Sequence, residues 1–310
     1  MTWLAVSLLA LAFLAAPSAV EAQSAKVPRI GVLVVVPPVI LKSFQEEFHA
    51  GLRELGYVEG QNILVDCRLV EGEVERLPPL ASELVRLKVD VIVASTTSAV
   101  EAAKGATSEI PIVMFGAGEP VGTGLVASLA RPGGNVTGLS TESPELGGKR
   151  LELLREILPS VTRVAALARA ADPIARPFVE QMQSAARSIG LRVQPVVVRG
   201  PEGFDGAFAA MVREQARAVV VQSILATPRV ADLALRHHLP TVTSARRFVE
   251  AGGLISFGAR LPDLYRRTAY FVDRILTRGP GRDHGSQLDG RNVPCTASTQ
   301  HSPGGEEVSA

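Results

Sequence analysis

The chain has 310 residues, of which 46% are hydrophobic and 20% are charged, and this apolar content excludes an intrinsically disordered protein. Its 32 Lys and Arg against 31 Asp and Glu give a formal net charge of +1, so total charge does not favour nucleic acid or an acidic membrane as a partner. Two cysteines exclude a disulfide-stapled scaffold and a cysteine-rich metal module.

The first 22 residues have the features of a secretory signal peptide. Residues 4–16 form an almost unbroken apolar run, and Val20 and Ala22 place an aliphatic and a small residue before a cleavage point after Ala22. The apolar run is too short to span a bilayer comfortably, which argues against a membrane anchor. We therefore predict cleavage of a signal peptide at 1–22, export to the periplasm, and a mature protein that is not embedded in the membrane.

From Arg29 the chain alternates between strand-like and helix-like segments. Residues 30–36 form a continuous run rich in β-branched side chains, typical of a parallel strand buried on both faces. Phe44, Phe48 and Leu52 then follow at helical spacing, and Gly56 ends that helix. The same criteria predict strands at 89–94, 110–115 and 136–140, and a helix at 77–87. This alternation predicts an open parallel α/β sheet.

The alternation starts again in the second half of the chain. It predicts helices at 146–157, 178–189 and 264–275, and strands at 163–167, 192–198, 218–222, 241–243 and 254–257. Ser95 precedes Pro111 by almost the same interval as Ser223 precedes Pro240. The repeated spacing favours two lobes of similar topology. The alternative, that all doubly wound sheets share such a period, stays open.

Short hydroxyl residues and glycines follow several of the predicted strands. In open parallel sheets, ligands bind beyond the carboxyl ends of strands, where helix N-termini offer free N–H groups. Each hydroxyl taken alone is usually a helix N-cap. Their recurrence in both halves of the chain favours a ligand enclosed between two such edges.

The sequence contains no convincing catalytic arrangement. Residues 122–127 fit the dinucleotide fingerprint, and Glu142 stands at the expected interval beyond them. The fingerprint follows Pro120, however, and lies beyond the tight turn after a strand in which a dinucleotide site is built. His237 and His238 have no further ligand at metal-binding spacing. We expect no enzyme, no cofactor and no metal; a dinucleotide-dependent oxidoreductase is the least favoured alternative.

Three long blocks, in order along the chain, resemble a single family. Residues 48–63 resemble its GLRELGYVEGxNI signature, residues 118–140 its GDPVGxGLVASLARPGGNVTGLS block, and residues 250–258 its EAGGLMSYG block. The family is that of ABC-transporter substrate-binding proteins, which includes tryptophan- and tyrosine-type binding proteins with the type 1 periplasmic binding fold. The resemblance covers roughly residues 29–277. It also implies that the fingerprint at Gly122 belongs to a helix of the first lobe.

The resemblance implies two Rossmann-like lobes, each an open parallel sheet with helices on both faces, joined by a hinge. Lobe one is expected at 27–140 and lobe two at 141–257, with a helix at 258–277 returning to lobe one. The implied function is capture of a small ligand, an amino acid among the candidates, and its delivery to the transmembrane subunits of an ABC permease. The alternative is an exported ligand sensor that partners a membrane signalling protein.

The family pattern also implies which residues contact the ligand. They lie after the predicted strands of both lobes and near the expected hinge stretches at 137–140 and 256–258. An Asn-Pro-like turn of the family is replaced here by residues 168–173, which leaves the ligand preference open. The implied ligand contacts are Pro37, Pro38, Ser95, Thr96, Thr97, Gly118, Glu119, Thr137, Ala168, Arg169, Ser223 and Phe257.

The end of the chain departs from the family. Residues 279–310 contain one Leu and no Ile, Phe, Met, Trp or Tyr, where the family continues with a strand and a helix. We expect an atypical, disordered tail at 278–310, produced by a shifted reading frame; a genuinely divergent tail is the alternative. In an oxidising compartment, Cys67 and Cys295 could pair, and the sequence leaves open whether they do.

Overall fold

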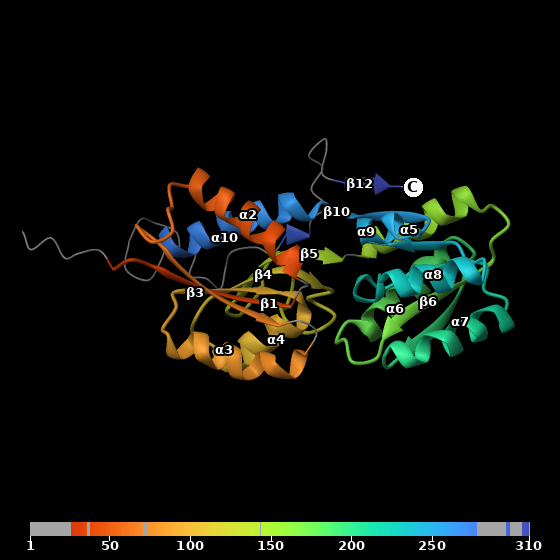
Figure 1. The fold of residues 1–310 in the computed structure, drawn as a ribbon, viewed down its shortest axis with the longest axis horizontal. Coiled ribbons are helices and arrows are strands. Elements are labelled where there is room, and N and C mark those ends of the chain that lie inside the picture. Colours follow the sequence, from red (N-terminus) through yellow and green to blue (C-terminus); the bar gives the residue numbers. More distant parts are fainter. Residues whose placement is uncertain are drawn as a thin grey trace, which may run out of the picture.

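The computed structural model describes residues 26–35, 38–70, 73–142, 144–277, 296–297 and 306–309. The predicted signal peptide, Pro37 and Cys295 lie outside the described residues. Among the helices within these ranges, none is long and apolar enough to cross a membrane. The described chain folds into two lobes that lie side by side (Figure 1).

Lobe one is built on a sheet with the strand order β11-β5-β4-β3-β1-β2, in which every pair is parallel. The apolar runs that the sequence predicts as strands form its centre, because both faces of the sheet are covered by helices. The strands are β1 (Arg29–Val35), β2 (Leu64–Val70), β3 (Val91–Ser95), β4 (Ile112–Gly118), β5 (Val136–Glu142) and β11 (Thr296–Ala297).

Two pairs of helices cover the sheet of lobe one. Helices α2 (Pro38–Glu54) and α10 (Leu261–Thr277) pack together on one face, and α3 (Leu77–Arg86) and α4 (Thr96–Ala106) on the other, with a 3-10 turn, η1 (Val74–Arg76), before α3 (Figure 1). Phe44 of α2 stacks on Phe115 of β4 with ring centroids 4.6 Å apart. Tyr265 of α10 meets Phe115 edge-on at 5.8 Å. These rings join α10, the last described helix, to the core of lobe one.

Lobe two is built on a sheet with the strand order β12-β10-β9-β8-β6-β7. Its strands are parallel except for β12, which pairs with β10 in the antiparallel sense. The strands are β6 (Arg163–Arg169), β7 (Arg192–Val198), β8 (Val219–Val221), β9 (Thr241–Thr243), β10 (Ile255–Ala259) and β12 (Glu306–Ser309). The helices are α5 (Pro144–Ile157), α6 (Ala175–Ser188), α7 (Phe204–Arg213), α8 (Pro228–Arg236) and α9 (Arg246–Glu250), with 3-10 turns η2 (Pro201–Gly203) and η3 (Ser223–Leu225).

The two sheets repeat one topology. In each, the first five strands along the chain are arranged in the order second, first, third, fourth, fifth. The prediction of two lobes of similar topology, each an open parallel sheet between helices, is therefore confirmed. The expected hinge stretches at 137–140 and 256–258 lie within β5 and β10, and the chain leaves these strands after Glu142 and Ala259.

Two local features differ from the sequence-based expectations. Strand β2 has no counterpart among the predicted elements, because Asp66 and Arg68 interrupt its apolar pattern at the edge of the sheet. The fingerprint at Gly122 was expected on a helix, and this was wrong: residues 120–124 form turns. Glu119, just before the turns, and Gly124, within them, have φ values of 43° and 73°, outside the right-handed helical region.

Six residues of the segment 278–310, for which we expect a disordered tail, are paired in strands. Strand β11 extends lobe one beyond β5, and β12 extends lobe two beyond β10. Each pairing uses backbone groups at an otherwise open sheet edge, so it does not require the apolar side chains that the segment lacks. The rest of the segment lies outside the described residues.

Candidate functional site

The carboxyl ends of the two sheets face each other and touch. A Cβ atom built on Gly118, the last residue of β4, would lie 2.8 Å from Cδ1 of Ile174, which precedes α6 in lobe two. Glu142, the last residue of β5, accepts a hydrogen bond of 3.0 Å from the hydroxyl of Ser244, which follows β9. Loops that follow strands, the usual position of ligand sites in open α/β sheets, therefore meet at this interface.

The two lobes use matching hydrogen bonds at these strand ends. In lobe one, the backbone N–H of Val35 at the end of β1 donates to Oγ of Ser95 at the end of β3, over 2.8 Å. In lobe two, the N–H of Arg169 at the end of β6 donates to Oε1 of Gln222 after β8, over 2.7 Å. Gln222 is 1% exposed, whereas Ser223 is exposed on η3. Gln222 therefore holds the place in lobe two that Ser95 holds in lobe one.

The predicted hydroxyls of lobe one support its strand ends. Thr97 is buried, and its Oγ1 accepts from the N–H of Gly118 at 3.2 Å and lies 3.3 Å from the carbonyl oxygen of the same residue. Thr96 has a positive φ of 64°, and its Oγ1 accepts a long hydrogen bond of 3.5 Å from the N–H of Ala99. The structure thus brings these residues together with Ser95, Gly118 and Glu119 at adjacent ends of β3 and β4.

The other residues implied by the family pattern have different surroundings. Thr137 is buried within β5, and Ala168 belongs to the core of lobe two. Phe257 is buried in β10, and its carbonyl oxygen accepts a hydrogen bond from Arg150. Pro38 is the first residue of α2, and Pro37 lies outside the described residues.

Glu119 directly follows β4 and is partly buried at the contact between the lobes. A Cβ built on Gly122 would lie 3.6 Å from Cβ of Pro177 in α6 and 3.8 Å from Cβ of Glu119, so Glu119 is close to lobe two. Its Oε1 is buried and has no hydrogen-bond partner among the described residues. Burial, reinforced by the nearby charges of Glu142 and Glu145, raises the pKa of Glu119 to about 7.

This raised pKa predicts how Glu119 affects stability as pH changes. The folded state holds the proton of Glu119 more tightly than the unfolded state does. The stability of the protein therefore falls as pH rises from the ordinary carboxyl pKa towards 7, and Glu119 causes no further loss at higher pH. Replacing Glu119 by Gln should therefore stabilise the ligand-free protein by about 1 kcal/mol at pH 8, after allowance for solvent screening of a partly exposed group. At pH 4.5 the gain should be absent. Thermal melts at both pH values check this, and an equal effect at the two would contradict it.

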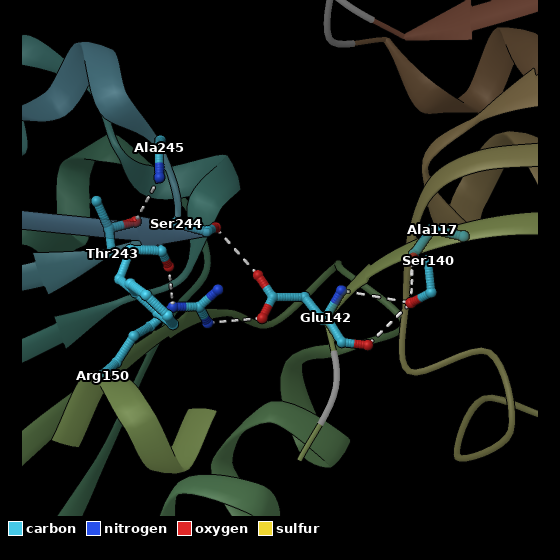
Figure 2. A network of polar contacts seen from close by, with 8 residues as sticks. Ala117, Ser140, Glu142, Arg150, Thr243, Ser244 and Ala245 are labelled. Atoms are coloured by element: carbon cyan, nitrogen blue, oxygen red, sulfur yellow. Dashed lines mark hydrogen bonds and ion pairs between the residues drawn. The ribbon is translucent and has the colours of Figure 1, made fainter. Parts of the chain in front are cut away.

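A buried polar network joins the lobes where the chain passes from β5 to α5 (Figure 2). Nη1 of Arg150 lies 2.6 Å from Oε2 of Glu142, and their side chains are 2% and 7% exposed. The same guanidinium donates from Nε to the carbonyl oxygen of Phe257 at 2.8 Å. Since Glu142 ends a strand of lobe one and Arg150 and Phe257 belong to lobe two, the network fixes one lobe against the other.

The network is anchored within lobe one by Ser140. Its Oγ lies 2.9 Å from the carbonyl oxygen of Ala117 and 2.8 Å from that of Glu142, and it accepts from the N–H of Glu142 at 3.3 Å. Neither Glu142 nor Arg150 was predicted as part of a site. A charged residue on the apolar side of the predicted helix at 146–157 is the signal that could have identified Arg150.

A cavity of about 460 Å³ lies between α4 and α6, and none of the residues of this network lines it. Glu101 and Thr123 of lobe one and Arg176 and Glu180 of lobe two are among the residues that line it. None of the predicted ligand contacts lines this cavity. Among the described residues there is also no cluster of three or more His, Cys, Asp or Glu that could hold a metal ion.

Comparison with known proteins relates this chain to substrate-binding proteins of ABC transporters. The family model for ABC transporter substrate binding proteins matches residues 29–284. A tyrosine-binding protein of Clostridioides difficile (strain R20291) is 27% identical over 241 residues, which are 77% of this chain and 69% of the relative.

Two solved structures are similar to this chain over most of its length. The ABC domain from Streptococcus pneumonia in complex with L-Trp is 27% identical, with a TM-score of 0.77 and coverage of 87% of this chain and 88% of that one. A conserved domain protein from Vibrio cholerae O1 biovar eltor is 25% identical, with a TM-score of 0.78 and coverage of 91% of both chains.

Proposed function

Because the chain belongs to the ABC transporter substrate-binding protein family, we propose that it is an exported solute receptor that delivers a small ligand to an ABC permease. Its fold is that of type 1 periplasmic binding proteins, with two Rossmann-like lobes. Membership of a solute-binding family supports a role in binding rather than catalysis.

The observation that carries the proposal is the contact between the carboxyl ends of the two sheets. Gly118 of lobe one meets Ile174 of lobe two, and Glu142 meets Ser244, so a ligand held by either set of strand ends is enclosed by the other. Two lobes that meet in this way suit hinge closure around a small molecule. The connections after Glu142 and Ala259 are the places where the hinge would bend.

We propose an amino acid as the ligand. The C. difficile relative is a tyrosine-binding protein, and the related ABC domain of known structure holds L-Trp. The contacts would come from Ser95, Thr96, Thr97, Gly118 and Glu119 in lobe one. In lobe two they would come from the ends of β6 and β8, where Arg169 and Ser223 lie. Pro37, Pro38, Thr137, Ala168 and Phe257 stay predictions from the family pattern.

A thermal-shift screen of the protein lacking residues 1–22 tests the binding function. The screen uses the amino acids, with a sugar and a dicarboxylic acid as unrelated solutes. At a hundredfold excess over its Kd, the cognate ligand should stabilise the folded state by about 2.7 kcal/mol, which corresponds to a rise in Tm of roughly 5–10 °C. A binding function for amino acids fails if none of them shifts the melting temperature.

A matched variant separates binding between the lobes from binding elsewhere. Leu in place of Gly118 would occupy the space that Ile174 fills and should prevent the lobes from meeting while leaving each lobe folded. The ligand-dependent rise in melting temperature should then be lost.

Delivery to the permease is tested separately: deletion of the gene should lower cellular uptake of the ligand. Unchanged uptake with intact binding would instead fit the exported sensor.

A further inference from the structure

Buried side-chain atoms without a hydrogen-bond partner mark places where a polar group from outside the chain could bind. Among the described residues, such atoms belong to Glu119, Arg150, Gln181, Gln194 and Gln222, whereas Nε2 of His49 lies 2.9 Å from Oε2 of Glu59. Of these residues, only Glu119 and Gln222 directly follow a strand at the facing carboxyl ends of the two sheets. Glu119 belongs to lobe one, and its Oε1 lacks a donor. Gln222 belongs to lobe two, and its Nε2 lacks an acceptor.

The surroundings of Glu119 favour a cation. Its Oε1 is a buried acceptor without a donor, and the charged groups that act on it most strongly are the carboxylates of Glu142 and Glu145. Arg150 is already paired with Glu142, and Arg176, which lines the same cavity as Gly122, is exposed and paired with Glu180. Its φ of 43° is uncommon for a residue with a side chain, and such strain is often kept where a residue is held for function.

The surroundings of Gln222 favour a hydrogen-bond acceptor. Its Oε1 is held by the N–H of Arg169, so the orientation of the amide is fixed, and its Nε2 is left without an acceptor. The residue is only 1% exposed, so water has little access to this donor. Leaving a buried donor unpaired is unfavourable, and a ligand carbonyl or carboxylate oxygen would satisfy it.

We propose that Glu119 and Gln222 are the two polar anchors of the ligand: Glu119 accepts from a protonated amine, and the Gln222 amide donates to a carboxylate. This inference rests on the proposed solute-binding function and specifies how a zwitterionic amino acid is recognised. Because each anchor belongs to a different lobe, a ligand that carries both groups links the lobes. A ligand that lacks either group engages only one of them.

Matched ligands that lack one group each provide the test. The probes are L-tryptophan, indole-3-propionate without the amine and tryptamine without the carboxylate, and the corresponding set for tyrosine. Calorimetry should show that the wild-type protein binds an amino acid about 10- to 100-fold more tightly than either truncated ligand, as expected for hydrogen bonds to charged groups.

Conservative variants test the contribution of each anchor to binding by itself. Glu119→Gln should weaken binding of the amino acid about 10- to 100-fold and leave binding of indole-3-propionate unchanged. Gln222→Glu keeps the acceptor for the Arg169 N–H but replaces the free donor by a carboxylate oxygen, so it should abolish the preference for ligands with a carboxylate. Glu250→Gln, at an exposed position of α9, and Gln194→Glu are the controls, and both should retain the wild-type preferences.

A pH series gives an independent readout. The ammonium group needs the ionised form of Glu119, whose pKa in the ligand-free protein is about 7. Affinity for tryptophan should therefore rise about tenfold between pH 6 and pH 8 in the wild type and stay constant in Glu119→Gln.

The outcomes separate this inference from the proposed function. Binding of an amino acid with equal affinity for its truncated forms, or unchanged preferences in Glu119→Gln and Gln222→Glu, overturns the inference and leaves the binding function intact. If neither the amino acids nor their truncated forms bind the wild-type protein, the proposed amino-acid function fails, and this inference fails with it.

Discussion

Replacing Arg150 by Met should lower the free energy of unfolding by about 3–5 kcal/mol, because it leaves Glu142 buried without its counter-charge. The two side chains are 2% and 7% exposed and 2.6 Å apart, so water cannot take over the role of the guanidinium. The carbonyl oxygen of Phe257 also loses its donor. Urea-induced unfolding followed by circular dichroism measures the effect; the only tryptophan, Trp3, belongs to the predicted signal peptide and offers no fluorescence signal in the mature chain.

Two further variants show whether the loss comes from the uncompensated charge. The double variant with Arg150→Met and Glu142→Gln should be more stable than Arg150→Met alone, since a neutral amide is less unfavourable in a buried site than an unpaired carboxylate. Arg176→Met removes an exposed partner of Glu180 and should change stability by less than about 0.5 kcal/mol. If Arg150→Met and Arg176→Met had equal effects, the buried pair would not stabilise the contact between the lobes.

Replacing Gly138 by Ala should destabilise the protein by about 3 kcal/mol or more. Gly138 lies in β5 with a φ of 129°, a conformation that residues with a Cβ rarely adopt. A Cβ there would lie 2.1 Å from the carbonyl oxygen of Met114 in the neighbouring strand β4, so the backbone of one strand would have to move. Since β4 and β5 end at Gly118 and Glu142, the displacement would also reach the contact between the lobes.

Gly105 provides the matched control for this substitution. It lies in α4 with open space around the position of a Cβ, and its φ is not in the left-handed region. Gly105→Ala should therefore stabilise the protein by about 0.5–1 kcal/mol, because alanine is the better helix former. Both variants are measured by urea unfolding. A loss for Gly138→Ala no larger than that of an ordinary surface substitution would contradict the proposed clash.

Much of the fold could be predicted from local patterns. The β-branched run at the start of the periodic region forms β1, because a strand buried on both faces has to be apolar along its whole length. The repeated interval between Ser95 and Pro111, and between Ser223 and Pro240, corresponds to two sheets of the same topology. Strand β2 was missed because it lies at the edge of the sheet, where Asp66 and Arg68 are tolerated.

The candidate site was predicted less completely than the fold. Hydroxyls and glycines after the apolar runs predicted Ser95, Thr97 and Gly118 as strand-end residues, and the structure places them at the adjacent ends of β3 and β4. In lobe two the same reasoning selected Ser223, whereas its neighbour Gln222 makes the bond that matches Ser95. A difference of one residue decides which side chain is buried, and the apolar pattern does not locate strand ends that finely.

By itself, the sequence determined most of the strands and helices and the division into two lobes, because these follow from the periodicity of apolar residues along the chain. The composition and charge of the chain, 46% hydrophobic residues and a net charge of +1, excluded other classes of protein without indicating a site. Only the tertiary structure decided which polar residues meet. Glu142 pairs with Arg150 and Ser244, and Glu119 follows Gly118 at the contact with Ile174, because the facing ends of two separate sheets bring these residues together. Whether a carboxylate is buried, paired or left without a partner depends on neighbours from distant parts of the chain, and no local pattern contains that information.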